Sequence, residues 1–291
     1  MATSTASKKL IVIEGPTGVG KTASSIELAQ KLQTEILSAD SRQFYKELNI
    51  GVARPSLEEL SKVPHHFIAH LSIESYYSVS KYEQEALLLL EHLFTLHDQV
   101  VMVGGSGLYV DAICQGIDDL PDPENALRED LKARLATDGI ESLRKQLQIL
   151  DPNYYAQVDL ANPKRLLRAL EVCLTTGKTY SSLRTQTPKT RPFQIERLAL
   201  TRPRAELYQR IDQRVEQMLS AGLLQEVASL QAYKELNALN TVGYKELFPY
   251  FENQISLDQA ILDIKTHSRR YAKRQLTWLK RNPSIQWISL S

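Results

Sequence analysis

Cysteine is scarce in this chain of 291 residues, which contains only Cys114 and Cys173. Two cysteines cannot build a disulfide scaffold, and both lie in apolar helical patterns, so we expect two buried free thiols. Long apolar runs are missing as well, because the runs at residues 10–13 and 86–90 are too short for a signal peptide or a membrane span. We therefore expect a soluble cytoplasmic protein with no membrane partner.

The chain also lacks an excess of charge of either sign, since 35 basic residues face 34 acidic ones and the net charge is +1. This balance hides two basic segments. Residues 164–204 carry a net charge of +8 and residues 264–281 a net charge of +7, which leaves −14 on the rest of the chain. A solvated charged face is one interpretation of such segments. Basic residues gathered in blocks are also typical of surfaces that bind a polyanion, and the distribution favours a nucleic-acid partner.

Apolar runs alternate with helical patterns in the first 120 residues. We predict strands at 10–14, 35–39 and 99–103 and helices at 22–33, 82–96 and 106–114. Strands that alternate with helices indicate a parallel sheet covered on both faces. Ligands of such sheets bind at the carboxyl ends of the strands, so the loops that follow the three strands should converge on one crevice.

The strand pattern stops between Pro121 and Pro192. We predict helices there at 124–137, 140–150 and 163–176. The remainder predicts a strand at 194–201, helices at 203–220, 222–235 and 256–280, and a last strand at 285–290. The chain should therefore form a core from residues 1–120 and 193–291, interrupted by an inserted all-helical domain at 121–192.

A phosphate-binding pattern, G-x-x-x-x-G-K-[ST], follows the first strand. It consists of Gly15, Pro16, Thr17, Gly18, Val19, Gly20, Lys21 and Thr22. The glycines let backbone N–H groups face an anion, and the start of the next helix adds partial positive charge. Lys21 supplies a point charge, and the Thr22 hydroxyl can ligate Mg²⁺. We predict an α/β fold with a P-loop NTPase-like parallel sheet and a diphosphate-bearing ligand.

Polar residues follow the second and third strands. Asp40 can take a proton from a nucleophile or hold a metal-bound water, although it can also cap the next turn. Ser106 brings a hydroxyl to the same crevice and is also a suitable helix N-cap. The third strand ends in Gly104-Gly105 without the acid expected of an ATPase. That weakens an ATPase interpretation and leaves a small-molecule kinase open.

The basic segments add a second kind of surface. Lys164, Arg165 and Arg168 share one side of a helix. Residues 267–281 interleave basic residues with Tyr271 and Trp278, which suits contact with a nucleic-acid backbone. Together with the phosphate loop, this predicts an enzyme that joins a diphosphate-bearing donor to a nucleic acid. A nucleoside or metabolite kinase competes evenly on the motifs alone, although the insertion is large for a kinase lid.

Several separated motifs resemble those of the tRNA dimethylallyltransferases, also called tRNA isopentenyltransferases. They are GPTGVGKT at 15–22, SADSRQFY at 38–45, VGGSGLY at 103–109, NPKRLLRALEV at 162–172, RAELYQRIDQR at 204–214, VGY at 242–244 and YAKRQLTWLK at 271–280. The resemblance implies transfer of the dimethylallyl group of dimethylallyl diphosphate to N6 of the adenosine 3′ of the anticodon, tRNA position 37, in tRNAs that read codons beginning with U. It implies Mg²⁺ as cofactor and the tRNA anticodon stem-loop as partner, and we expect a monomer.

The resemblance also implies residue roles. Asp40 matches a general base, Ser106 stands near the bridging oxygen of the diphosphate, where many members have Thr, and Arg204 matches an arginine that faces the diphosphate. Lys21 and Thr22 match the diphosphate and Mg²⁺ positions. The tRNA-contacting positions are Asp40, Ser41, Arg42, Gln43, Ser106, Arg128, Lys164, Arg165, Leu166, Leu167 and Arg168, to which we add Lys273 and Arg274 from the basic segment.

Departures and alternatives remain beside this resemblance. Ala161 stands where many members have Asn, in the Asn-Asp pair before the insertion helix, and Lys245 replaces a common Arg, which bears on contacts to tRNA. The zinc finger of eukaryotic members is absent, and two cysteines could not build one. A kinase, an isopentenyltransferase of free AMP, ADP or ATP, and a non-catalytic RNA-binding module are the alternatives. The intact loop at 15–22 argues against the last.

Overall fold

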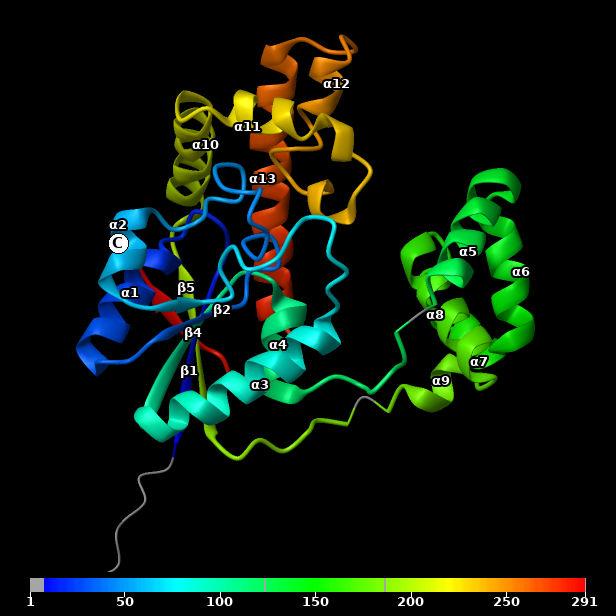
Figure 1. Ribbon diagram of the computed structural model, residues 1–291, viewed down its shortest axis with the longest axis horizontal. Coiled ribbons are helices and arrows are strands. Elements are labelled where there is room, and N and C mark those ends of the chain that lie inside the picture. The colour runs from blue at the N-terminus through cyan, green and yellow to red at the C-terminus, as the bar shows by residue number, and fades with distance from the viewer. Residues whose placement is uncertain (1–7, 123, 186, 291) are drawn as a thin grey trace, which may run out of the picture. The chain divides into compact units, whose positions relative to one another are not determined.

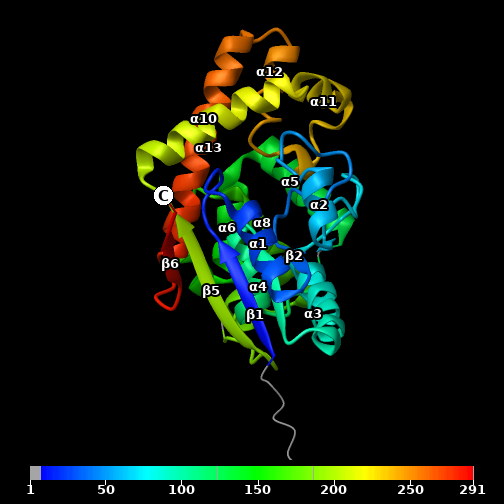
Figure 2. The same ribbon diagram turned by 90° about the vertical axis from the view of Figure 1, so that its left-hand side faces the viewer.

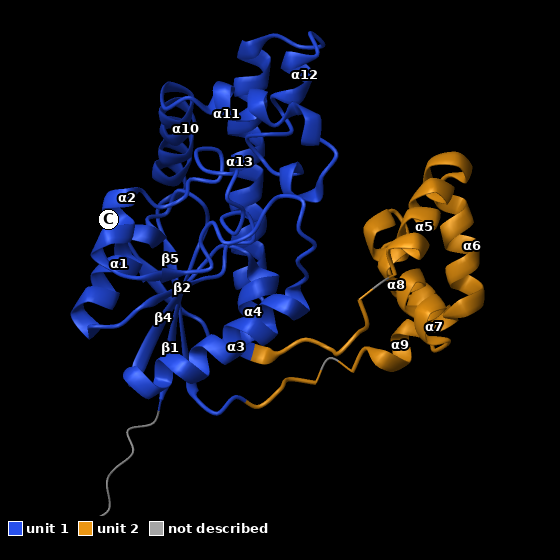
Figure 3. Cartoon of the chain, in the orientation of Figure 1, with its two compact units in different colours: residues 1–114, 191–291 blue, residues 115–190 orange. Residues whose placement is uncertain are grey.

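The computed structural model describes residues 8–122, 124–185 and 187–290 and divides the chain into two compact units. Figure 3 shows residues 1–114 with 191–291 as the first unit and residues 115–190 as the second. The sequence placed these boundaries at 120/121 and 192/193. The first unit is called the core below, and the second is called the helical unit.

The core is built on a six-stranded sheet in the order β3-β2-β4-β1-β5-β6, with every neighbouring pair parallel. The strands are β1 (Lys9–Glu14), β2 (Ile36–Ser38), β3 (His65–His66), β4 (Gln99–Val103), β5 (Gln194–Thr201) and β6 (Gln286–Ser289). Figure 2 shows β1 and β5 side by side. The chain therefore returns from the helical unit to pair with its own first strand.

Alternate residues of the strands bury opposite faces of the sheet, as a two-residue period requires. Leu10 and Val12 pack with α3 (Val79–Leu96) and α4 (Gly107–Gln115). Ile13 packs on the other face with α1 (Lys21–Leu32) and α10 (Arg204–Ser220). Each such side chain stabilises the fold by roughly 1.5–3 kcal/mol when fully buried. Helices on both faces leave the carboxyl edge of the strands as the place where the loops meet (Figure 1).

The rest of the core is a further set of helical segments. These are α2 (Leu57–Lys62), α11 (Leu223–Ser229), η1 (Gln231–Tyr233), η2 (Asn237–Leu239), α12 (Phe248–Phe251) and α13 (Leu257–Leu279). The helix predicted at 222–235 is too long, because the N–H groups of Leu230 and Tyr233 bond three residues back and the chain tightens into a 3₁₀ turn. Neither α2 nor β3, which are six and two residues long, was predicted from the sequence.

The helical unit has its own hydrophobic core. Its helices are α5 (Asn125–Asp138), α6 (Ile140–Leu150), α7 (Pro152–Tyr155), α8 (Pro163–Thr176) and α9 (Tyr180–Leu183). Leu131, Leu143 and Leu170 are fully buried among them. Asn162 caps α8 by accepting the Arg165 N–H. All three helices predicted from the sequence are present.

The structure bears on the two cysteines and on the lack of long apolar segments. Cys114 and Cys173 are both free and buried, as expected. In the part of the chain that the structure describes, no helix combines the length and the apolar character needed to cross a bilayer.

Candidate functional site

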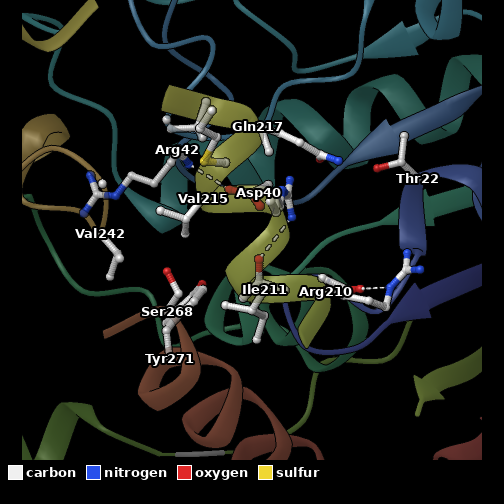
Figure 4. Close-up of a pocket in the computed structure, with 18 of the residues that line it drawn as sticks. Thr22, Asp40, Arg42, Arg210, Ile211, Val215, Gln217, Val242, Ser268 and Tyr271 are labelled. Carbon is white, nitrogen blue, oxygen red and sulfur yellow. Dashed lines mark hydrogen bonds between the residues drawn. The ribbon is translucent and has the colours of Figure 1, made fainter. Parts of the chain in front are cut away.

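A cavity of about 470 Å³ opens at the carboxyl edge of the sheet. Its walls come from the phosphate loop, the loop after β2, residues 51–53 and 241–243, and the facing sides of α10 and α13. Figure 4 shows Ile211 and Val215 of α10 on one side, with Ser268 and Tyr271 of α13 nearby. The first two strand-end loops line this cavity, and all three meet in a smaller pocket lined by Lys21, Asp40 and Gly104, as the predicted convergence requires.

The phosphate loop has the backbone that its glycines allow. Gly15 has φ +148°, and a Cβ there would lie 2.9 Å from the Leu200 carbonyl oxygen. Lys21 begins α1, and its Nζ donates to the carbonyl oxygens of Gly15 and Pro16, each at 3.0 Å. Burial lowers the pKa of Lys21 to about 8, while the Asp40 carboxylate acts in the opposite direction. The loop thus holds its own cation next to the cavity.

Arginines that the sequence analysis did not single out surround this loop. Arg210 Nε donates to the Gly18 carbonyl at 2.9 Å, and Arg214 Nη1 donates to Thr17 Oγ1 at 3.2 Å. Burial lowers the pKa of Arg214, and Asp40 again opposes the shift. Both arginines line the cavity. Their four-residue spacing within RAELYQRIDQR was the signal that could have found them.

Arg204 does not occupy the position that the resemblance implied. Its side chain is exposed, its guanidinium lies 5.1 Å from the centre of the Tyr208 ring, and it is not among the residues that line the cavity. Arg210 and Arg214, on a different face of the same helix, approach the phosphate loop instead. Arg204 therefore lies away from the cavity in this structure, and its role at the diphosphate stays a prediction.

Asp40 has the two roles that its position suggested, because it caps the turn after β2 and also lines the cavity. Its Oδ1 accepts the Arg42 N–H at 3.1 Å, so the carboxylate caps the turn after β2. It also lines the cavity, where its charge acts on Lys21 and Arg214. A carboxylate in this position is available as a proton acceptor.

The next residues of this loop are engaged with neighbouring backbone. Arg42 Nη1 donates to the Asn237 carbonyl at 2.7 Å. Gln43 Nε2 donates to the carbonyls of Val52 and Ala53 at 3.2 and 3.0 Å. These bonds fix the loop against two other walls of the cavity. Contact of Arg42 and Gln43 with tRNA stays a prediction.

Ser106 lies against the Asp40 loop. Its Oγ accepts the Ser41 N–H at 3.0 Å and lies 3.1 Å from Ser41 Oγ. Its carbonyl accepts the N–H of Tyr109 and Val110, so Ser106 also begins α4. The two interpretations of this serine are compatible, and the structure brings it next to the loop of the predicted base.

Helix α13 lies behind these loops. Gln275 contacts both the phosphate loop and the loop after β4, through the Thr17 N–H and the Gly105 carbonyl. Burial raises the pKa of Tyr271 to about 12. A second cavity of about 150 Å³ lies between α13 and residues 104–108. Tyr271, which the sequence pattern placed among basic residues of a nucleic-acid surface, lines both cavities.

A buried ion-pair network lies at the end of β1, directly before the phosphate loop. Arg197 donates from Nε and Nη2 to the Glu14 carboxylate at 2.6 and 2.8 Å, and its Nη1 lies 2.9 Å from Asp111 Oδ1. Trp278 Nε1 donates to Asp111 Oδ2 at 2.8 Å. Glu14 directly precedes Gly15, so the network fixes the end of β1 to β5, α4 and α13. No motif in the sequence predicted it.

The basic segment of α13 divides into two parts. Lys265 and Arg269 pair with Glu216 and Asp212 of α10. Lys273 and Arg274 are exposed, and Arg274 lies 5.6 Å from the centre of the Tyr271 ring. The exposed pair remains available to a polyanion, whereas the first pair holds two helices together.

The predicted tRNA-contacting residues of the helical unit also differ in exposure. Lys164 and Arg165 are exposed, and Leu167 and Arg168 are half-buried. Arg128 Nε donates to the Glu171 carboxylate at 2.8 Å. Leu166 is fully buried in the core of the unit, so its side chain packs there and cannot meet RNA as it stands. That correction follows from helical periodicity, which turns Leu166 inward between the exposed Arg165 and the half-buried Leu167.

The donor groups at the cavity suit Mg²⁺. Among the described residues, no group of three or more His, Cys, Asp and Glu side chains could hold a metal by itself. Mg²⁺ is commonly bound by one or two protein oxygens together with phosphate oxygens. The Thr22 hydroxyl and the Asp40 carboxylate line the same cavity and are oxygen donors of this kind.

The family described as IPP transferase matches residues 43–282. The tRNA dimethylallyltransferase 1 of Bacteroides fragilis is 52% identical, with coverage of 97% of this chain and 93% of that protein. The tRNA dimethylallyltransferase of Christiangramia forsetii is 50% identical over 97% of this chain and 93% of its own length.

Solved structures agree with these relatives. The tRNA isopentenylpyrophosphate transferase of Bacillus halodurans has a TM-score of 0.71 at 34% identity, over 97% of this chain and 90% of that one. A eukaryotic dimethylallyltransferase solved while acting on tRNA has a TM-score of 0.80 at 29% identity, over 97% and 74%. The resemblance and the α/β fold class predicted from the sequence are confirmed, and the chain belongs to the IPP transferase family.

Proposed function

We propose that this protein transfers the dimethylallyl group of dimethylallyl diphosphate to N6 of the adenosine at tRNA position 37, in tRNAs that read codons beginning with U. The products are N6-dimethylallyladenosine and diphosphate. The observation that carries the proposal is the position of Asp40, which lines one cavity with the phosphate loop and acts electrostatically on Lys21 and Arg214. Relatives named as tRNA dimethylallyltransferases support it. A tRNA substrate makes the cytoplasm the expected compartment.

The phosphate loop binds the leaving group. Lys21 Nζ donates to two loop carbonyls, and a diphosphate offers it stronger, charged acceptors. Lys21, Arg214 and the loop N–H groups then stabilise the charge that develops on the diphosphate. Thr22 is the residue that would hold Mg²⁺, which when bound would neutralise part of that charge.

The acceptor adenine must leave its stack to reach the cavity, a step that costs less in a loop than in a duplex. N6 attacks the allylic C1, the N6–C1 bond forms, and the C1–O bond breaks with its electron pair passing to the diphosphate. Asp40 accepts the proton that N6 loses. The Ser106 hydroxyl, held beside the Asp40 loop, orients the reacting groups.

Exposed cations supply the attraction for the anticodon stem-loop. Lys273 and Arg274 lie on the core, and Lys164 and Arg165 lie on the helical unit. Contacts of this kind set the position of the RNA backbone without reading its bases. The residues that line the cavity must then select the target adenosine.

A label-transfer assay tests the proposal. The protein is incubated with Mg²⁺ and dimethylallyl diphosphate labelled in the allyl group, together with unmodified tRNA, the same tRNA with guanosine at position 37, or AMP. Label that appears only with the first acceptor and elutes as N6-dimethylallyladenosine after digestion is the expected result. Label on AMP would identify a free-nucleotide isopentenyltransferase, and ATP consumption without tRNA would identify a kinase.

A further inference from the structure

The side chain of Gln275 joins two loops that lie far apart in the sequence. Its Oε1 accepts the Thr17 N–H at 2.8 Å, and its Nε2 donates to the Gly105 carbonyl at 2.9 Å. Only 8% of Gln275 is exposed. One carboxamide therefore spans from the phosphate loop to the residue that precedes Ser106.

The segment around Gly105 is shaped to receive this helix face. A Cβ on Gly105 would lie 2.5 Å from Gln275 Nε2, and a Cβ on Gly107 would lie 2.5 Å from two ring atoms of Trp278. Tyr271 hydroxyl lies 3.5 Å from the same Gly105 carbonyl. Tyr271, Gln275 and Trp278 recur at i, i+4 and i+7, so one stripe of α13 supports the whole segment.

The two bonds need opposite chemistry at the two ends of one side chain. The Thr17 N–H needs an acceptor, and the Gly105 carbonyl needs a donor. A glutamine amide provides both, an ionised glutamate provides only acceptors, and a leucine provides neither. A side chain chosen for packing alone would not need this polarity.

We propose that Gln275 is a positioning residue for the transfer reaction, and that its carboxamide fixes the separation between the diphosphate loop and the loop that carries Ser106. The inference rests on the proposed function. The first loop holds the leaving group, and the second holds a hydroxyl next to the Asp40 loop. Their spacing therefore sets how the allylic C1 lies between the diphosphate and N6. An error in this spacing lowers the rate of the chemical step more than it lowers the affinity for tRNA.

Three variants test this role by steady-state kinetics with tRNA and dimethylallyl diphosphate. Gln275→Leu removes both bonds, and we expect kcat to fall by at least about tenfold while the KM for tRNA changes by less than about threefold. Gln275→Glu keeps the acceptor for Thr17 but loses the donor for Gly105. The matched control is Gln259→Leu on the exposed face of the same helix, where the side chain bonds Asp263, and kcat should not change.

The glutamate variant provides a signature that packing would not produce. A protonated glutamic acid can accept from Thr17 and donate to Gly105, so the ratio of its kcat to that of the wild type should rise as pH falls from 8 to 6. Gln275→Leu should show no such recovery. The charged and titratable groups around the site are Lys21, Asp40, Glu14, Tyr271 and Arg274, with Arg42, Glu59, Arg210 and Arg214 on the other walls of the cavity. They are present in both proteins, so the ratio removes their own titration.

The outcomes separate this inference from the proposed function. A wild-type protein that transfers no label overturns both. An active wild type with unchanged kcat in Gln275→Leu, or with a loss confined to KM, overturns the positioning role alone. A kcat loss that only follows the unfolded fraction, measured by thermal melting, together with a flat pH ratio in Gln275→Glu, assigns the residue to packing and also overturns it.

Discussion

Asp40 combines two functions in one carboxylate, because it caps its own loop and lies in the cavity beside Lys21 and Arg214. A substitution that removes the side chain would disturb both functions at once. Asparagine retains an oxygen for the Arg42 N–H but cannot take a proton. An asparagine at position 40 therefore separates the geometry of the loop from base catalysis.

We expect Asp40→Asn to lower kcat by at least about 10²-fold, the usual range for loss of a general base. The Kd for tRNA should stay within about threefold, since the loop retains its cap. Single-turnover transfer and a filter-binding assay measure the two quantities. Asp98→Asn, which removes an exposed carboxylate paired with Lys8, is the control and should behave as wild type. Near-normal turnover of Asp40→Asn would exclude it as the base.

Arginines of α10 provide the second prediction at this scale. Arg214→Gln removes a cation beside the phosphate loop, and we expect the KM for dimethylallyl diphosphate to rise by at least about tenfold, as for the loss of a charged hydrogen bond. Arg204→Gln, on the exposed face of the same helix, should change it by less than twofold. The reverse order of effects would restore the interpretation of Arg204 that the resemblance implied.

These residues show what a single sequence could and could not predict. Lys21, Thr22, Asp40 and Ser106 follow strands in recognisable patterns, so their meeting at one edge follows from topology. Arg214 and Gln275 reach the phosphate loop from positions 197 and 258 residues further along the chain. The four-residue spacing of Arg210 and Arg214 indicates a shared helix face, but it does not encode what that face contacts. Long-range pairing, rather than chemistry, was the missing information.

At the scale of elements, α13 both holds the core and presents charge. Its first half pairs with α10 through Lys265 and Arg269, and its second half leaves Lys273 and Arg274 exposed. The composition of the helix alone could not make this distinction, because the acids that neutralise the first pair belong to another helix. The two pairs carry equal charge and therefore form a matched comparison.

We expect the double variant Lys273→Ala, Arg274→Ala to weaken tRNA binding and to reduce the slope of log K against log salt by about 1.5, or about 0.7–0.9 per lost phosphate contact. The variant Lys265→Ala, Arg269→Ala removes the same charge from ion pairs within the protein. It should lower the melting temperature and leave the slope unchanged. Titrations between 50 and 200 mM salt measure both. Equal slopes in the two variants would remove Lys273 and Arg274 from the RNA surface.

Element prediction succeeded where burial follows a clear period and failed where it does not. The helix at 163–176 and the strand at 194–201 match the predicted bounds, because a cap, a glycine stop and apolar periodicity agree there. The two-residue strand β3 exists because Ile36 and Leu37 of β2 pair with His65 and His66. Such a strand is made by its partner rather than by its own composition.

At the scale of the whole molecule, each unit has its own hydrophobic core and its own cysteine. Cys114 belongs to the core and Cys173 to the helical unit. Burial raises the pKa of the Cys114 thiol to about 12 and also raises that of Cys173. Thiolates are the reactive form, so neither thiol should react while its unit is folded.

We expect both thiols to react with a thiol reagent at pH 8 only as denaturant is added, with each reporting on its own unit. The sign of the pH effect follows from the raised pKa of Cys114. The unfolded chain loses this proton above about pH 8.5 while the folded chain keeps it, so the free energy of unfolding should fall as pH rises beyond that point. Cys114→Ala should reduce this dependence in urea titrations. Fast labelling in native buffer would contradict the burial.

Removal of the insertion tests whether the core folds and binds diphosphate without the helical unit. The Lys189 N–H donates to the Gln115 carbonyl at 2.7 Å, so the ends of the insertion lie together and a short Gly-Ser linker can replace residues 116–189. The described residues of the hydrophobic clusters that pack against the sheet lie outside this range, and the insertion forms a separate cluster of its own.

We expect the shortened protein to melt cooperatively and to bind inorganic diphosphate with unchanged affinity. It should lose tRNA binding by at least about tenfold, because it lacks one of the two exposed basic surfaces. Full tRNA affinity in the shortened protein would place recognition in the core alone, and failure to fold would make the two units one cooperative structure.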